Sequence, residues 1–255
     1  FICSGNLLVA GEGDRTHLLA VDATRLHTFL RWEEAEAMLT ARVAANPKRT
    51  QPLLTFIELA SRTGRSDRVP ELADRALALL DAQGFQPEAM QQRSRLFTLL
   101  LELVRNSRLA WTNPNPTPEL GAARPIKNVA LLEAVIDRLS RAAESAPQIV
   151  AALLERAWLA EKQNNAPAAI EAYQQILVDS ALCAVELDPE ARLAESDARA
   201  SSFINARAEA TDRLIALVKR VGPAPYAAFD EEAARRLAEE YFDSNKVLSR
   251  LLDRL

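Results

Sequence analysis

Glycine, histidine and aromatic residues are all scarce in this sequence. Its 255 residues include only 7 glycines and 2 histidines, and 5% of the side chains are aromatic. His17 and His27 have no second histidine nearby with which to share a metal ion. The sequence also lacks Ser/His/Asp sets, Cys/His pairs and glycine-rich phosphate loops at a credible spacing. We therefore expect no enzymatic activity, no cofactor and no metal site, and we assign no catalytic residue.

Cysteine is nearly as rare. Cys3 and Cys183 lie far apart and form no pair motif. We expect a free thiol near a strand at Cys3 and a small apolar helix residue at Cys183. A disulfide between the two is the alternative. Two cysteines therefore do not settle whether the protein resides in an oxidising or a reducing compartment.

The chain also has no strong excess of charge and no long apolar run. Its net charge is −4 and 26% of its residues are charged, so no overall field attracts nucleic acid or an anionic membrane. No apolar stretch approaches the roughly 18 residues that a membrane-spanning helix needs. Carboxylates and arginines are spaced mainly three or four residues apart, which predicts ion pairs along exposed helices. We expect neither a nucleic-acid partner nor a transmembrane segment.

Alanine and leucine are abundant and recur at helical spacing. Ala35, Leu39 and Val43 form one stripe, which ends at Pro47 because the residue before a proline is disfavoured in the α region. Gly64 permits the positive φ that often ends a helix, and Ser66 or Asp67 is placed to cap the next one. Two more stripes face each other across this turn: Leu53, Phe56, Ile57 and Ala60, then Leu72, Ala73, Ala76 and Leu80.

These stripes resemble the tetratricopeptide repeat, a helix–turn–helix unit of 34 residues. Three stretches carry the resemblance: Trp32, Ala35, Leu39 and Pro47; then Ile57, Ala60, Gly64, Ala73 and Ala76; then Ala157, Ala160, Ala169, Tyr173 and Ile176. The departures are Val69 and Pro70 in one unit and Asn164 at a usual glycine position. The resemblance implies a mainly α fold, a right-handed α-solenoid of antiparallel helical hairpins over residues 23–255. An ordinary alanine-rich helical bundle is the alternative.

Further helices are expected along the rest of the chain. Periodicity and proline or glycine breaks predict helices at Pro87 to about Ser107 and at Lys127–Ser145, a hairpin over 148–187 whose second helix continues past Asp179, a long helix over 190–220, and helices near 228–241 and 244–255.

Residues 1–22 form a separate region. The apolar runs 6–11 and 16–22 flank the turn signals of 12–15, which predicts a β-hairpin. A phosphate-binding loop at Gly11, Gly13 and Asp14 is the weaker alternative, since the lysine and the following helix are missing. This hairpin resembles the last blade of a bacterial β-propeller of the pyrroloquinoline-quinone-enzyme type. That resemblance implies a preceding propeller domain and favours the periplasm or cell envelope.

A proline-rich loop at 106–126 is the clearest irregular segment. Alternating prolines impose an extended path and remove backbone donors. We expect an exposed Trp111 beside rigid prolines to offer contact area at little entropic cost. The candidate partner-contact residues are therefore Trp111, Pro114, Pro116 and Pro118. A passive connection between repeats is the alternative.

Function follows from this architecture rather than from a catalytic motif. The first residue is Phe1 and the last predicted helix ends abruptly, so we expect a piece of a longer polypeptide. Stacked helical hairpins form a surface that can hold an extended peptide or a helix. We expect a non-catalytic interaction or scaffolding module that binds protein partners or other parts of the same polypeptide. The alternatives are a helical tail on a quinoprotein-like enzyme and a structural subunit of an envelope assembly.

Overall fold

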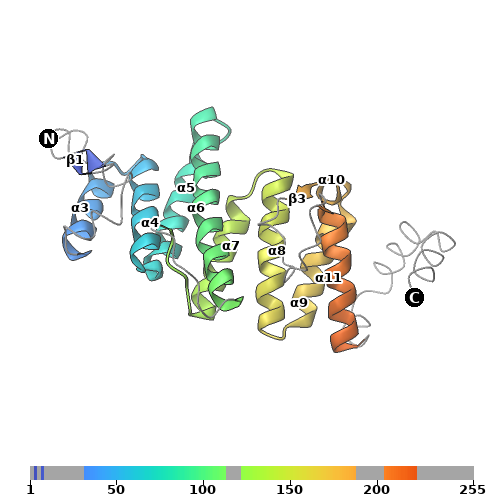
Figure 1. Ribbon diagram of the computed structural model, residues 1–255. Helices are drawn as coiled ribbons and strands as arrows, with labels where there is room; N and C mark the ends of the chain where they lie inside the picture. Colours follow the sequence, from blue (N-terminus) through green and yellow to red (C-terminus); the bar gives the residue numbers. More distant parts are fainter. Residues whose placement is uncertain (1–2, 5–6, 9–31, 113–121, 188–203, 223–255) are drawn as a thin grey trace. The chain divides into compact units, whose positions relative to one another are not determined.

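The computed structural model describes residues 3–4, 7–8, 32–112, 122–187 and 204–222 (Figure 1). Within these ranges the chain is mainly helical, with nine α-helices and four strands of two residues each. The mainly α class predicted from the sequence is therefore confirmed. The chain divides into two compact units, Phe1–Gln148 and Ile149–Leu255, and each is described by itself.

The first unit contains five described helices: α3 (Trp32–Ala45), α4 (Gln51–Thr63), α5 (Val69–Gln83), α6 (Pro87–Thr112) and α7 (Val129–Ala142). Helix α4 packs on α3, α5 and α6, and α5 and α6 both pack on α7, so the helices lie side by side (Figure 1). Ala35, Leu39 and Val43 are buried, which confirms the first predicted stripe. The largest fully buried side chains of this core include Leu53, Leu54, Ile57, Leu59, Leu77, Leu80, Leu96, Leu100 and Leu103.

The turn between α4 and α5 begins as the sequence predicts. Gly64 has φ +80°, and the Arg65 N–H donates to the Ala60 carbonyl at 2.8 Å, a common way to end a helix. The predicted side-chain cap is wrong. Ser66 and Asp67 form a single 3₁₀ turn, Ser66–Arg68, and no side chain caps α5.

The second unit holds most of α8 (Ala146–Lys162), together with α9 (Ala166–Val178), α10 (Ser180–Cys183) and α11 (Ala206–Val221). Helix α9 packs against α10 and α11. The end of α8 repeats the geometry of the end of α4: Asn164 has φ +56°, and the Asn165 N–H donates to the Ala160 carbonyl at 2.8 Å. Asparagine is one of the few residues other than glycine that adopts this conformation readily.

The two helix pairs also share the spacing of their buried side chains. In α4 and α8, Leu53, Ile57 and Ala60 match Leu153, Ala157 and Ala160. In α5 and α9, Ala73, Ala76, Leu77 and Leu80 match Ala169, Ala172, Tyr173 and Ile176. All of these side chains are buried. Buried positions therefore recur at the same spacing in both helix pairs.

Two helix boundaries of the second unit differ from the prediction. Helix α9 stops at Val178, because the Asp179 carboxylate caps α10 by accepting from the Ala181 N–H at 2.8 Å. Helix α11 starts only at Ala206, where Asn205 accepts from the Ala208 N–H at 2.9 Å. Before it, β4 (Ile204–Asn205) pairs antiparallel with β3 (Glu186–Leu187). The helix expected from residue 190 is therefore wrong at residues 204–205, and 188–203 lie outside the described residues.

At the N-terminus, β1 (Cys3–Ser4) pairs antiparallel with β2 (Leu7–Leu8). This is a different pairing from the predicted one between residues 6–11 and 16–22. The second predicted strand, the two histidines and the Gly11–Asp14 turn lie outside the described residues, as do the predicted helices near 228–241 and 244–255. Cys183 is a buried residue at the end of α10, as expected of a small apolar helix residue, and its thiol is free.

Candidate binding groove

The first unit has a polar groove of about 680 Å³. One side comes from the last turn of α3, the α3–α4 connection and the first turn of α4, and the other from the end of α5 and the start of α6. The lining residues are Arg42, Asn46, Lys48, Arg49, Thr50, Gln51, Pro52, Thr55, Gln83, Gln86, Glu88 and Gln92. A groove of this size is large enough for a peptide segment or a small ligand.

Basic side chains outnumber acidic ones in this lining. Arg42, Lys48 and Arg49 are basic, and Glu88 is the one carboxylate among the lining residues. Glu88 is already engaged, since its Oε1 accepts from Gln92 Nε2 at 3.1 Å. The remaining polar residues are mostly amides, which both donate and accept hydrogen bonds. The groove therefore favours a ligand that carries negative charge and amide-like hydrogen-bonding groups.

Three polar atoms of the groove residues are buried and have no hydrogen-bond partner within the described part of the chain. They are the Thr50 hydroxyl oxygen, Arg42 Nε and Gln92 Oε1. Thr50 is only 1% exposed. Buried polar atoms nearly always have partners, so each exception needs a reason. The three atoms together offer a donor, an acceptor and a hydroxyl that can act as either.

The backbone at the start of α4 explains why the Thr50 hydroxyl accepts no hydrogen bond from the first turn of the helix. Thr50 is the N-cap residue, but its φ of −78° and ψ of −32° are helical. A capping threonine normally has extended angles, and its oxygen then accepts from the first turn. Here the Thr50 carbonyl accepts from Leu53 N–H at 2.9 Å and from Leu54 N–H at 3.1 Å, while Pro52 has no N–H to offer. The hydroxyl therefore has no local capping role.

Polar contacts link the elements that line the groove. Gln83 Nε2 lies 3.4 Å from the Lys48 carbonyl, which joins the end of α5 to the α3–α4 connection. Arg95 on α6 donates to Gln51 Oε1 at 3.4 Å and to Glu58 Oε2 at 3.0 Å. Glu58 is buried and also pairs with Arg62. These contacts place the groove on a scaffold of packed helices rather than on a free loop.

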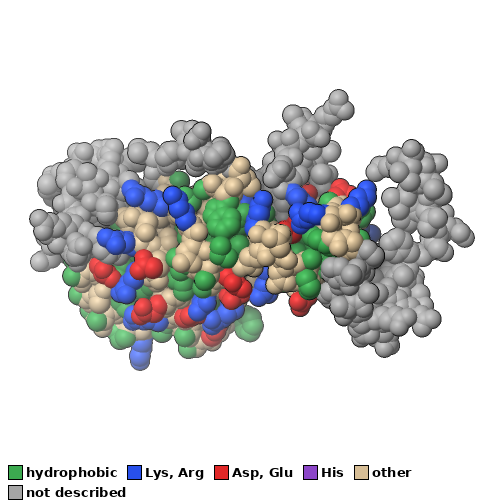
Figure 2. Space-filling model, turned by 90° about the horizontal axis from the view of Figure 1, so that it is seen from below, with side chains coloured by type: hydrophobic (Ala, Val, Ile, Leu, Met, Phe, Trp, Pro, Cys, Tyr) green, Lys and Arg blue, Asp and Glu red, His purple; other side chains and the backbone are tan. Residues whose placement is uncertain are grey.

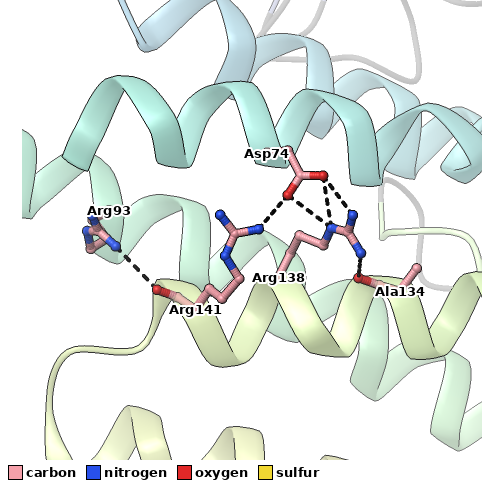
Figure 3. A network of polar contacts seen from close by, with 5 residues as sticks. All are labelled: Asp74, Arg93, Ala134, Arg138 and Arg141. Atoms are coloured by element: carbon pink, nitrogen blue, oxygen red, sulfur yellow. Dashed lines mark hydrogen bonds and ion pairs between the residues drawn. The ribbon is translucent and has the colours of Figure 1, made fainter. Parts of the chain in front are cut away.

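A second polar cluster, centred on Asp74, is satisfied internally (Figure 3). The Asp74 carboxylate accepts from Arg138 and from Arg141. The Arg138 hydrogen bond is the largest cause of a lowered Asp74 pKa, and the same bond raises the pKa of Arg138. Arg93 pairs with Asp81 and with Glu144, and it donates to the Arg141 carbonyl. Three arginines thus balance three carboxylates, which indicates a structural role.

Trp111 is held by its own chain, whereas the sequence predicted an exposed side chain. The residue lies on α6, is half-buried, and its Nε1 donates to the Ile126 carbonyl at 3.2 Å. Helix α6 runs to Thr112, so residues 106–112 are helical and the loop predicted from residue 106 begins later. The other candidate contacts, Pro114, Pro116 and Pro118, lie outside the described residues. A partner contact at this site remains a prediction.

Residues 122–128 form an extended segment, here called the strap, that lies against α6 and the end of α4. Side chains of α6 bind its backbone: Glu102 accepts from the Ala123 N–H at 3.2 Å, Asn106 donates to the Ala123 carbonyl at 3.1 Å, and Ser107 accepts from the Ile126 N–H at 2.9 Å. The Arg124 N–H donates to the Ser61 carbonyl of α4 at 2.9 Å. The strap shows how this unit holds an extended chain through polar side chains.

The sequence carries a signal for the groove, although no recognised motif marks it. Lys48, Arg49 and Thr50 directly follow the helix break at Pro47, and glutamines cluster around Gly84, the second helix break after it. Every second connection in a series of antiparallel neighbouring helices lies at the same edge. Only the pairing of α4 with α5 and α6 brings these two groups together.

Beyond the charge of the groove, neither the charges on the face drawn in Figure 2 nor similarity to known proteins narrows the function. On the face drawn in Figure 2, basic and acidic side chains are interspersed rather than separated. No described helix combines the length and apolar character needed to cross a membrane. Among the described residues, no group of three or more His, Cys, Asp or Glu is placed to hold a metal ion. No protein-family model, curated protein or solved structure matches the chain.

Proposed function

We propose that this chain is a non-catalytic protein-interaction module that binds a segment of a partner protein in the groove of its first unit. The observation that carries the proposal is the Thr50 hydroxyl, which is buried beside the groove without a partner. An unsatisfied buried polar group costs about 1–3 kcal/mol in the free protein. A ligand that turns the buried Thr50 side chain towards the groove and supplies the missing hydrogen bond would recover part of that free energy.

The proposal extends to the architecture. We propose that the α4–α5 and α8–α9 pairs are tetratricopeptide-like units of a right-handed α-solenoid. Two observations support this: the matched turns at Gly64 and Asn164, and the matched spacing of buried residues on the paired helices. Each such hairpin buries only part of its apolar surface, so neighbouring hairpins must stack to complete a core. Stacked hairpins leave a continuous surface on which a partner segment can lie.

An immobilised array of peptides of varied sequence, probed with the purified chain, tests the function. The groove variants are Thr50→Val, which removes the unpartnered hydroxyl, and Arg42→Gln. Thr98→Val is the matched control, because Thr98 is exposed on α6 and does not line the groove. We expect a subset of peptides to bind the wild type and the control equally and both groove variants at least about tenfold more weakly. Equal binding by all four proteins, or no bound peptide at all, would overturn the proposal.

A further inference from the structure

We propose that the groove recognises an acidic, extended segment within a partner chain, with side-chain carboxylates placed on the basic residues and the main chain paired with the amides. This inference rests on the proposed function and specifies the chemistry of its ligand. It is carried by the groove's charge, by the mixture of unpartnered donors and acceptors, and by the way the same unit holds its own strap.

Charge comes first. Arg42 lies in the last turn of α3, and Lys48 and Arg49 lie in the connection that follows. Guanidinium groups bind carboxylates through paired hydrogen bonds, and a lysine adds a compact charge. Glu88, the opposing carboxylate, is hydrogen-bonded to the Gln92 amide. The groove thus carries more positive than negative charge, although the whole chain has a net charge of −4.

The unpartnered atoms distinguish a peptide from a simple anion. A phosphate or sulfate ion mainly accepts hydrogen bonds, which suits Arg42 Nε but leaves the Gln92 Oε1 acceptor without a donor. A peptide main chain supplies an N–H and a carbonyl at every residue other than proline. Once the Gln92 and Thr50 side chains turn towards the groove, it can donate to Gln92 Oε1 and pair with the Thr50 hydroxyl while its acidic side chains reach the cations. A groove of about 680 Å³ also exceeds what one small ion fills.

The strap provides a precedent in the same unit. There, the Glu102, Asn106 and Ser107 side chains of α6 pair with both N–H and C=O groups of an extended backbone. The groove presents side chains of the same polar kind, with glutamine and threonine in place of asparagine and serine. An extended backbone is therefore a mode of binding that these helices already support.

The placement of the cations points to a segment within a chain rather than to a free carboxyl end. Arg42 comes from a helix, whereas Lys48 and Arg49 come from the connection after it. Cations that belong to two elements can contact successive acidic side chains, so the charge of a terminal carboxylate is not required. Peptides with acetylated and amidated ends should bind as well as peptides with free ends.

Fluorescence anisotropy with the full 255-residue chain tests the inference. The probes are end-blocked peptides of mixed Glu, Asp and Ser sequence, matched peptides with Gln and Asn in place of the acids, a phosphoserine version and a version with a free carboxyl end. The groove variant is Lys48→Gln with Arg49→Gln. Its control is Lys162→Gln with Lys219→Gln, which removes the same charge from exposed positions in the second unit.

We expect the acidic peptide to bind at least about tenfold more tightly than its amide counterpart. The groove double variant should lose about tenfold in affinity for the acidic peptide, and the control double variant should bind it like the wild type. Thr50→Val should weaken both peptides. Added salt should weaken the acidic peptide more than the neutral one, because it screens the exposed cations.

The other outcomes separate the two proposals. If the amide peptide binds as well as the acidic one and Thr50→Val weakens both, the groove function stands and the acidic inference is overturned. If neither peptide binds, the acidic inference fails, and the array of varied peptides decides whether the groove function stands. Equal losses in the groove and control double variants would mean unspecific attraction and would overturn the inference. A clear preference for phosphoserine or for a free carboxyl end would overturn it in favour of that other anion.

Discussion

Arg138 on α7 holds both carboxylate oxygens of Asp74 on α5, with Nε 3.2 Å from Oδ1 and NH2 2.7 Å from Oδ2. Arg141, one helical turn further along α7, binds the same carboxylate at 2.6 Å. Figure 3 shows both arginines reaching from one helix towards a single aspartate on the other. The two helices also pack directly, so these ion pairs reinforce a contact that apolar side chains already make.

Asp74→Asn should destabilise the first unit by about 1 kcal/mol, the upper end for a partly exposed ion pair in a network. The substitution keeps the shape of the side chain but leaves two arginines facing a neutral amide. Urea unfolding near neutral pH measures the change. Asp81→Asn is the matched control: among the described side chains Asp81 pairs with Arg93 alone, and its own side chain is 60% exposed, so its effect should be smaller. A larger effect of Asp81→Asn would contradict this account.

The stability lost in Asp74→Asn should depend on pH. Because its pKa is lowered in the folded protein, Asp74 contributes stability at pH values above its unfolded pKa of about 3.9. That contribution is lost as the pH falls through the lower, folded pKa. The stability difference between wild type and Asp74→Asn should therefore be constant above about pH 5 and should shrink under more acidic conditions. A difference that grows on acidification would contradict the assigned direction.

The turns at Gly64 and Asn164 should respond alike to substitution. Both residues have positive φ, where alanine costs roughly 1–2 kcal/mol. We expect Gly64→Ala and Asn164→Ala to lower the unfolding free energy by about 1 kcal/mol, and Gly64→Asn and Asn164→Gly to be better tolerated. At Gly64 an added Cβ would lie 3.2 Å from Arg124 Cδ, so Arg124→Ala should reduce the cost of Gly64→Ala. Chemical denaturation of these four variants, of Arg124→Ala and of the double variant Gly64→Ala with Arg124→Ala measures these differences.

The strap should loosen when its α6 contacts are removed. Ser107→Ala leaves the buried Ile126 N–H without its acceptor, which should cost about 1–3 kcal/mol. Hydrogen exchange at the Ile126 amide should accelerate. Trp111→Phe removes the indole donor to the Ile126 carbonyl and should have a smaller effect, since this hydrogen bond is only partly buried. If Trp111→Phe leaves the strap intact but weakens peptide binding, the predicted partner contact at Trp111 gains support.

Tyr173 should stay protonated in the folded protein at alkaline pH. Its side chain is fully buried, and its hydroxyl donates to Glu161 at 2.6 Å. Burial is the largest cause of its raised pKa, and the nearby Glu161 charge adds to it. Ionisation of the unfolded tyrosine above about pH 10 therefore favours unfolding, and stability should fall there. Absorbance titration of the folded protein should not detect Tyr173, and Tyr173→Phe should lose one tyrosine signal only in urea.

Local patterns predicted most helices but not the polar site. Apolar spacing and the breaks at Pro47 and Gly64 place α4 close to its observed bounds, because those signals act through the backbone of neighbouring residues. The left-handed Asn164 was also visible as a departure from the repeat pattern. The start of α11 was missed because residues 190–220 were interpreted as one helix, and the Asn205 side-chain bond that caps α11 is not evident from the sequence.

Ion pairs between separate helices could not be predicted from the sequence for a different reason. Arginine and carboxylate spacing predicted pairs within single helices, and Glu58–Arg62 and Glu209–Arg213 are such pairs. Asp74–Arg138 and Glu161–Arg220 instead join separate helices. A charged side chain can usually pair within its own helix or with a neighbouring helix, so its spacing in the sequence does not decide between the two. The groove depends on the same information, since Arg42 and Gln92 line one hollow only after α3, α4 and α6 have packed.

The strap also has a kinetic consequence. The contacts between α4 and α5 close a short turn, whereas the Arg124–Ser61 bond requires α5 and α6 to be in place between its two ends. Closing the longer loop costs more chain entropy, so the strap should dock after the folding transition state has formed. Weakening the strap by Ser107→Ala should then accelerate unfolding while leaving the refolding rate almost unchanged. The chain would thus secure its longest described helix, α6, in the last step of folding and release it in the first step of unfolding.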